Sequence, residues 1–332
     1  MTRALVLSGG GPVGIAWEAG LLAGLAEGGV DLATADYILG TSAGSFVGSQ
    51  LAMGRKAGDM AGAILKEADR VSPAVAAGSR PSGGGGAPNL GVLFQKMAEA
   101  RSGERDPKEV RREIGQFALE AKTMDEESFI KSFGRQLSET AADAWPSRGY
   151  ACTAVDAETG EFVVWDAGSK VGLARAVASS CSVPGIFPPI TINGRRYIDG
   201  GMRSGSNADI ATGHELVVVV GLRTAGDAET SARMRAPLDQ EMRVLRDGGA
   251  RTELILPDDA SVAAFGLNLM DGRKRPGACQ AGIEQGRALA GALRSVWNWP
   301  SPLRGGWPSA AKVGWGCPTR QRTPSTASAR GL

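Results

Sequence analysis

The feature that most constrains this chain is a short apolar segment that runs into a glycine-containing turn and then into a helical pattern. Near the N-terminus this arrangement occurs twice. Ala4–Leu7 leads into Ser8–Gly14, and apolar residues then recur every three or four positions up to Gly28. Tyr37–Gly40 leads into Thr41–Gly44 and a helix of small residues. Two strand–loop–helix units in series predict the start of a parallel α/β sheet that is covered by helices.

Later segments extend this pattern over most of the chain. A helix is expected from Lys170 to about Ser179, and Asn193-Gly194 is a strong signal for a two-residue hairpin. Further strands are expected at Tyr150–Val155, Phe162–Trp165, Ile190–Ile192, Arg195–Asp199, Leu216–Val220 and Glu253–Leu256. The predicted fold class is therefore α/β with a mainly parallel central sheet.

Residues 76–145 interrupt the alternation of strands and helices. Positions 76–89 hold five glycines and two prolines, which is typical of a flexible loop. Asp106-Pro107 then predicts a helix start, and Thr123–Glu126 has the pattern of a capping box. We expect a loop followed by a helical segment that packs over the sheet, with a lid as the alternative role.

Charge divides the chain into a body and a tail. Residues 300–332 contain five basic and no acidic residues, together with five prolines and seven Ser or Thr, so a disordered basic tail is expected. The remaining residues, 1–299, form the expected single domain and carry a formal charge of −3, although the whole chain has +2. A mildly acidic body gives no indication of a nucleic-acid partner.

Hydropathy and cysteine spacing indicate the cellular setting. The longest aliphatic run, Leu216–Val220, is far shorter than a membrane span, and Ala4–Leu7 is too short for a secretory signal. The single histidine, His214, and four widely spaced cysteines favour neither a zinc site nor disulfides. A cytoplasmic protein is expected, and Trp307 and Trp315 in the basic tail leave peripheral membrane contact as an alternative.

Gly40–Gly44 has the pattern G-x-S-x-G between a predicted strand and a predicted helix. A serine hydroxyl becomes an effective nucleophile when a sharp turn presents it at the edge of a sheet, and the glycines at positions 40 and 44 allow such a turn. Ser42 is therefore a candidate nucleophile. The alternative is a serine that only caps the following helix.

The glycine run Gly9–Gly14 also lies between a strand and a helix. Consecutive glycines let backbone N–H groups approach a negatively charged oxygen, as in the oxyanion hole of an acyl hydrolase. The candidate residues for this hole are Gly9, Gly10, Gly11 and Gly14. The same letters match the dinucleotide fingerprint, but that motif needs an acid at the end of the second strand, and Asp36 precedes this strand instead.

Two residues compete for the role of the base. His214 comes directly before the strand Leu216–Val220, whereas Ser42 follows its own strand. In a parallel sheet these positions lie at opposite ends, so a structural role is expected for His214. Asp199 ends the predicted hairpin in the sequence Asp-Gly-Gly, where it is either the proton acceptor or an ordinary turn residue.

These motifs, in this order, resemble the patatin-like phospholipase family, in its bacterial members. The glycine-rich loop stands at Gly9–Gly14, G-x-S-x-G at Gly40–Gly44 and D-G-G at Asp199–Gly201, and Ala178–Pro189 is similar to the stretch that the family carries ahead of D-G-G. The resemblance covers roughly residues 1–299. It implies a three-layer α/β/α fold and a Ser–Asp dyad that hydrolyses lipid or phospholipid acyl esters.

By this resemblance Ser42 is the nucleophile, Asp199 accepts its proton, and the amides of Gly10 and Gly11 bind the oxyanion. The motif glycines are Gly40, Gly44, Gly200 and Gly201. No cofactor or metal is expected. Family loops often carry Arg or Lys after the glycines, whereas this chain has Pro12-Val13. The alternatives are a non-catalytic lipid-binding protein on the same fold and, ranked lower, a dinucleotide-dependent oxidoreductase.

Overall fold

Five adjacent parallel strands make up most of an eight-stranded sheet in the computed structural model, which describes residues 1–70, 93, 95–97, 99, 104–137, 143–223, 228–266 and 268–298. The strand order is β5-β6-β3-β2-β1-β7-β8, and β4 also pairs with β3. The strands are β1 (Arg3–Leu7), β2 (Tyr37–Gly40), β3 (Gly149–Asp156), β4 (Phe162–Asp166), β5 (Ile190–Ile192), β6 (Arg195–Asp199), β7 (Leu216–Val220) and β8 (Arg251–Ile255).

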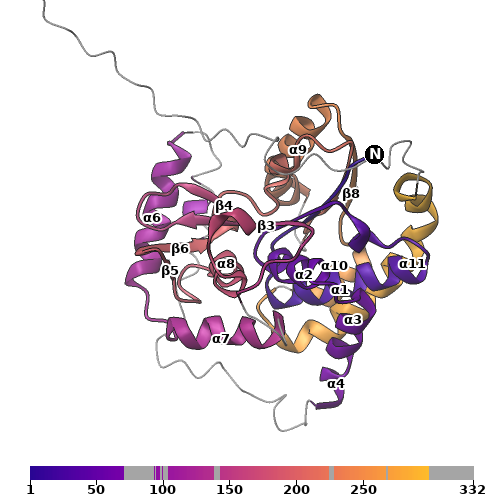
Figure 1. The fold of residues 1–332 in the computed structure, drawn as a ribbon, viewed down its shortest axis with the longest axis horizontal. Helices are drawn as coiled ribbons and strands as arrows, with labels where there is room; N and C mark the ends of the chain where they lie inside the picture. The colour runs from indigo at the N-terminus through magenta and orange to yellow at the C-terminus, as the bar shows by residue number, and fades with distance from the viewer. Residues whose placement is uncertain are drawn as a thin grey trace, which may run out of the picture. The chain divides into compact units, whose positions relative to one another are not determined.

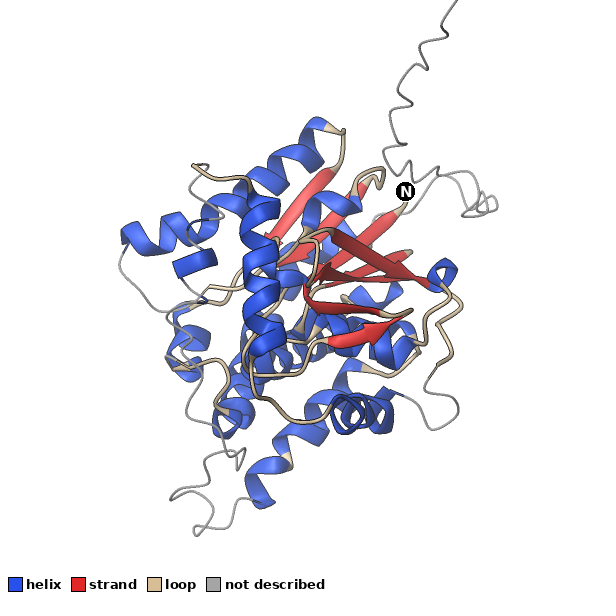
Figure 2. Ribbon diagram, turned by 90° about the vertical axis from the view of Figure 1, so that its left-hand side faces the viewer, coloured by secondary structure: helices blue, strands red, loops and turns tan. Residues whose placement is uncertain are grey.

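Helices cover both sides of the sheet (Figure 1, Figure 2). They include α1 (Gly11–Glu27), α2 (Ala43–Ala52), α3 (Ala57–Leu65), α4 (Glu67–Arg70), α6 (Pro107–Glu120), α7 (Glu126–Leu137), α8 (Leu173–Ser180), α9 (Ala228–Asp247), α10 (Asp259–Phe265) and α11 (Arg275–Trp297). Helices α1, α2, α8 and α11 share one hydrophobic cluster with the sheet, and α9 and α6 form separate clusters with it. The sheet is therefore the middle layer of three, as the α/β prediction requires.

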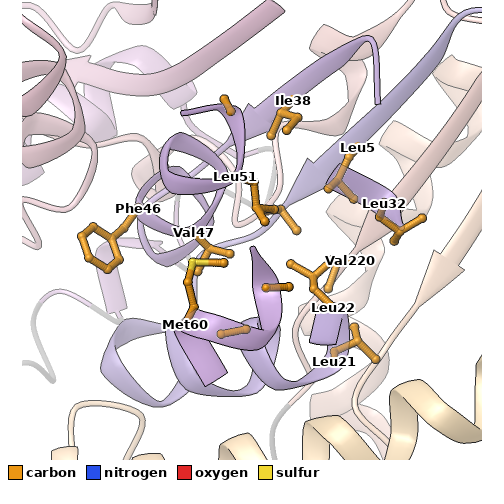
Figure 3. Packing of buried hydrophobic residues seen from close by; sticks show 14 of the residues in the cluster. Leu5, Leu21, Leu22, Leu32, Ile38, Phe46, Val47, Leu51, Met60 and Val220 are labelled. Atoms are coloured by element: carbon orange, nitrogen blue, oxygen red, sulfur yellow. The ribbon is translucent and has the colours of Figure 1, made fainter. Parts of the chain in front are cut away.

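Alternation along the strands explains why the central segments are apolar throughout. On β7, Leu216, Val218 and Val220 belong to the cluster with α1 and α11, whereas Val217 and Val219 belong to the cluster with α9. A strand buried on both faces needs apolar residues at every position. Figure 3 shows Leu5, Ile38 and Val220 from the strands packing with side chains from the helices, such as Leu51 and Met60.

Strand β3 is the element that brings two distant strands together. Its residues 151–155 pair with β4 along one edge, so β2 and β6 must both use the other edge. Gly40 of β2 lies opposite Cys152, and Asp199 of β6 lies opposite Ala154. Because β2 is parallel and β6 antiparallel to β3, the C-terminal ends of β2 and β6 point toward each other along that edge.

Most sequence-predicted elements are present, with differences at some boundaries: the helix expected from Lys170 begins at Leu173. The hairpin is confirmed, with positive φ angles at both Asn193 (51°) and Gly194 (78°), as its two-residue turn requires. The last strand begins at Arg251, before the predicted start. The capping box at Thr123 is wrong, because Asp125 instead accepts the N–H of Ser128 at the start of α7. The predictions for residues 76–89 and 300–332 lie outside the described residues.

Candidate active site

Ser42 occupies a strained turn between β2 and α2. Its φ and ψ are 52° and −117°, a left-handed φ that a non-glycine residue adopts only when its surroundings impose it. The turn requires glycine at two positions, because neighbouring backbone atoms leave no room there for a side chain. A Cβ at Gly40 would lie 2.3 Å from Ser45 Cα, and one at Gly44 would lie 2.2 Å from the carbonyl oxygen of Leu7. The G-x-S-x-G pattern is thus a packing requirement of this strand–helix turn.

Asp199 ends β6 and is almost completely buried, with 2% of its surface exposed. Its Oδ1 accepts the N–H of Gly201 at 2.7 Å, and Oδ2 is buried without a hydrogen bond of normal geometry in the described part of the chain. Gly200 has no room for a side chain, since a Cβ there would lie 2.2 Å from Thr153 Oγ1. The D-G-G turn therefore packs closely against β3, and it leaves one carboxylate oxygen of Asp199 without a hydrogen bond of normal geometry among the described residues.

The segment Ser180–Ser182, at the C-terminal end of α8, connects Ser42 to Asp199. Ser180 Oγ accepts the N–H of Ser42 at 3.0 Å, and the Cys181 thiol donates to the Ser42 carbonyl oxygen at 3.1 Å. Two residues on, the Ser182 carbonyl oxygen accepts the N–H of Asp199 at 3.0 Å. The structure therefore brings together the two residues that the sequence proposed as a dyad.

Burial dominates the electrostatics of Asp199. It raises the pKa of this carboxyl from 3.8 to about 7, and hydrogen bonding to the Ser42 hydroxyl and to the Gly201 N–H limits the rise. The Ser42 hydroxyl thus lies close enough to favour the carboxylate, although it does not complete a bond of normal geometry to Oδ2. A carboxyl group with a pKa near 7 can accept a proton at neutral pH far better than an ordinary aspartate.

The glycine loop lies beside Ser42, and only part of it can bind an anion. A Cβ at Gly9 would lie 3.3 Å from Ser42 Cβ, but the Gly9 N–H donates to the Gly205 carbonyl oxygen at 2.8 Å. The Gly14 N–H donates to the Gly10 carbonyl oxygen. These two predicted oxyanion donors are therefore already used within the chain. Gly10 and Gly11, at the start of α1, have N–H groups with no acceptor among the described residues.

His214 lies at the opposite end of the sheet from Ser42. It precedes β7, its ring stacks on Tyr37 at the start of β2 with 5.1 Å between ring centroids, and its Nδ1 lies 3.1 Å from the Ala211 carbonyl oxygen. Because β2 and β7 both run parallel to β1, the start of β2 is far from the turn that follows its end. The structural role expected for His214 matches this position.

Sequence analysis did not identify several residues around the site. Thr41, Thr153 and Asn207 form a buried polar group behind Ser42 and Asp199, with Thr41 Oγ1 and Thr153 Oγ1 2.9 Å apart. Thr41 lies within the G-x-S-x-G motif, where its position is unspecified. No local pattern marks Asn207 as part of the site, because its contacts depend on how distant segments fold together.

We also searched the rest of the described structure for cavities, metal sites and membrane-spanning helices. A cavity of about 240 Å³ lies between β8 and α11, and none of its lining residues belongs to the candidate site. Within the described ranges there is no group of three or more His, Cys, Asp or Glu side chains placed to hold a metal ion. Of the helices described, none has both the length and the apolar character needed to cross a membrane.

Comparison with known proteins gives an independent result. The family model described as Patatin-like phospholipase matches residues 5–212. Among solved structures, VipD from Legionella pneumophila aligns at 16% identity and a TM-score of 0.43 over 88% of this chain and 67% of VipD. The type III effector protein ExoU aligns at 15% identity and a TM-score of 0.35 over 88% of this chain, which spans about half (53%) of that chain. None of the curated proteins matches significantly.

Proposed function

Because the chain belongs to the patatin-like phospholipase family, we propose that it is a serine acyl hydrolase that cleaves acyl esters of lipids or phospholipids through Ser42 and Asp199. The observation that supports this proposal most is that β2 and β6 pair with the same edge of β3 and run toward each other. The strained Ser42 follows the end of β2, and the buried Asp199 ends β6. Strain at a non-glycine residue persists only when its surroundings enforce it, and it is concentrated at functional sites.

The proposed reaction proceeds in two steps. Ser42 Oγ attacks the ester carbonyl carbon while the Asp199 carboxylate takes the hydroxyl proton, and the carbonyl oxygen becomes an oxyanion. The ester C–O bond then breaks, and the leaving alcohol takes the proton from Asp199. In the second step a water molecule gives a proton to Asp199 and attacks the acyl carbon of the acyl-enzyme. The bond from that carbon to Ser42 Oγ then breaks, Asp199 returns the proton to Ser42 Oγ, and the fatty acid is released.

Backbone N–H groups supply the proposed stabilisation of the oxyanion. Gly10 and Gly11 are the candidate donors, because their N–H groups are free of acceptors among the described residues. Each such donor is worth about 3 kcal/mol of the barrier. Pro12 lacks an N–H and Val13 adds no positive charge, so this loop offers an ester oxygen hydrogen bonds but no cation for a phosphate. We therefore propose that recognition here is of the acyl ester itself.

A substrate panel tests this function. Short-chain p-nitrophenyl esters, triacylglycerol and phosphatidylcholine vesicles are incubated with the wild type, Ser42→Ala and Ser49→Ala. Ser49 is a suitable control because it is a buried serine of α2, the helix that follows Ser42, and its hydroxyl donates to the Phe46 carbonyl oxygen at 2.8 Å, away from the candidate site. We expect Ser49→Ala to keep the fatty-acid release that Ser42→Ala loses. Equal release by the wild type and Ser42→Ala would rule out the proposed nucleophile.

A further inference from the structure

The loop Ser204–Asn207, between the D-G-G turn and β7, contacts all three segments of the candidate site. The Gly205 carbonyl oxygen accepts the N–H of Gly9 in the glycine loop at 2.8 Å. The Ser206 carbonyl oxygen accepts the hydroxyl of Thr41, the residue before Ser42, at 3.3 Å. Ser204, Ser206 and Asn207 are all buried, at 5%, 3% and 0% exposure. Such a loop can fix the relative positions of segments that are distant in sequence.

The side-chain amide of Asn207 links the ends of β2 and β6. Its Nδ2 donates to Thr41 Oγ1 at 3.1 Å and to the Ser204 carbonyl oxygen at 2.8 Å, and it lies 3.3 Å from the carbonyl oxygen of Gly200, the residue after Asp199. Arg203 donates to Oδ1 at 2.9 Å, so the amide cannot turn over without losing this bond. The donor end of the amide therefore faces both Thr41 and Gly200.

We infer that Asn207 is a positioning residue that sets the separation of Ser42 and Asp199 by bridging Thr41 and Gly200. The inference rests on the proposed function and adds a residue that the motifs do not include. It follows from the topology, because β2 and β6 each pair with β3 but do not pair with each other. Their meeting point therefore depends on such polar contacts, and a misplacement of about 1 Å at a reacting group can cost about 10²-fold in rate.

The backbone of Asn207 supports this choice of residue. Its φ is 51°, a left-handed value that asparagine, aspartate and glycine tolerate better than other residues. Asn207→Gly keeps that backbone conformation and removes only the amide. Asn193 has the same φ of 51° in the exposed turn between β5 and β6. Asn193→Gly is therefore a matched control that changes an asparagine without touching the site.

The experiment measures kcat and KM for p-nitrophenyl butyrate and the rate at which a fluorophosphonate labels Ser42. For Asn207→Gly we expect kcat and the labelling rate to fall about 10- to 100-fold with KM within about threefold of the wild type, whereas Asn193→Gly keeps wild-type values. A role in fold stability alone would lower the active fraction, which active-site titration reports, and would leave kcat per active site unchanged.

A second variant, at Thr41, tests the same hydrogen bond in case Asn207→Gly does not fold. Thr41→Val removes one acceptor of the Asn207 amide, Thr41 Oγ1, with little change in volume, and it is expected to lower kcat, whereas Thr41→Ser keeps the hydroxyl and most of the wild-type kcat. Ser42→Ala is measured in parallel. If Ser42→Ala keeps its activity, the proposed function itself is wrong. If Ser42→Ala is inactive but Asn207→Gly and Thr41→Val keep the wild-type kcat, only the positioning role of Asn207 is overturned.

Discussion

The surroundings of Asp199 disfavour its carboxylate form, which is the form that its proposed role requires. Its carboxyl is buried, one oxygen lacks a hydrogen bond of normal geometry among the described residues, and burial raises its pKa from 3.8 to about 7. Few nearby groups stabilise the carboxylate, so the ionised form costs folding free energy at neutral pH. The same imbalance makes the carboxylate a better proton acceptor. Stability and the proposed activity are therefore opposed at this position.

This opposition predicts how Asp199→Asn changes stability with pH. In the wild type the folded state holds its Asp199 proton up to about pH 7, whereas the unfolded chain releases it near 3.8. The contribution of Asp199 to wild-type stability therefore falls as the pH rises from about 4 to about 7 and then levels off. Asparagine mimics the neutral acid at every pH, so Asp199→Asn becomes progressively more stable than the wild type over this range, by up to roughly 4 kcal/mol.

Urea unfolding of both proteins at pH 5, 6, 7 and 8 measures this difference. Other carboxyls with raised pKa values, such as Glu241, are present in both proteins, so their contributions cancel. A stability difference that does not change between pH 5 and pH 8 would show that the pKa of Asp199 is not raised in the folded protein.

Helices α1 and α11 illustrate why so many glycines occur in this chain. They pack with backbone against backbone. A Cβ at Gly20 or at Gly24 of α1 would lie 2.1 Å from a carbonyl oxygen of α11, and one at Gly286 of α11 would lie 2.3 Å from the carbonyl oxygen of Leu21. Some of the 48 glycines of the chain are therefore needed for this close contact between α1 and α11. Because α1 begins at the glycine loop, this packing also supports the proposed oxyanion hole.

Alanine substitution distinguishes a glycine packed against another helix from a glycine with open space around it. Gly24→Ala would place a methyl group against the Ile283 backbone, so we expect it to destabilise the fold by about 1–3 kcal/mol or more. Gly291 is also in α11, but a Cβ there would have no atom within 4 Å, so Gly291→Ala should stabilise by about 0.5–1 kcal/mol. Thermal unfolding compares the two. Equal effects from both variants would mean that α1 and α11 are not in backbone contact.

Local patterns were sufficient to predict most of the strands and helices. Alternation, glycine-containing turns and the Asn193-Gly194 hairpin are short-range signals, and the structure confirms the elements that they predicted. The capping box at Thr123 failed because Asp125 offers a competing cap two residues later. The sharing of one β3 edge by β2 and β6 could not be predicted, because strand pairing over long separations leaves no local pattern.

The candidate site is assembled from segments that lie far apart in the sequence. Motifs identified the candidates Gly10, Ser42 and Asp199, because each sits at a strand end where a particular residue type is needed. Among the described residues, the N–H groups of Gly10 and Gly11 have no acceptor, whereas those of Gly9 and Gly14 donate to carbonyl oxygens of the chain. Which amides are already occupied depends on the whole fold, so glycine spacing alone cannot reveal it.

At the scale of the whole chain, Met1–Trp299 forms one unit by its internal contacts. We therefore expect a chain that ends at Trp299 to fold with a melting temperature within about 2 °C of the full-length protein, which for a domain of this size corresponds to about 1 kcal/mol or less. Short-chain esterase activity should be retained. Calorimetry and p-nitrophenyl butyrate hydrolysis test both expectations. A large loss of soluble protein on truncation would show that residues 300–332 are needed for folding.

The identity of the proton acceptor decides between an aspartate-based and a histidine-based mechanism. We would compare kcat/KM for p-nitrophenyl butyrate in the wild type, Asp199→Asn and His214→Gln from pH 5 to pH 9, with folding checked by circular dichroism. Wild-type activity should rise with pH through an apparent pKa of about 7, because the carboxylate of Asp199 is the active form. Asp199→Asn should lose at least about 100-fold, whereas His214→Gln should stay within about threefold of the wild type. A folded His214→Gln protein without activity, together with an active Asp199→Asn protein, would contradict the Ser42–Asp199 dyad.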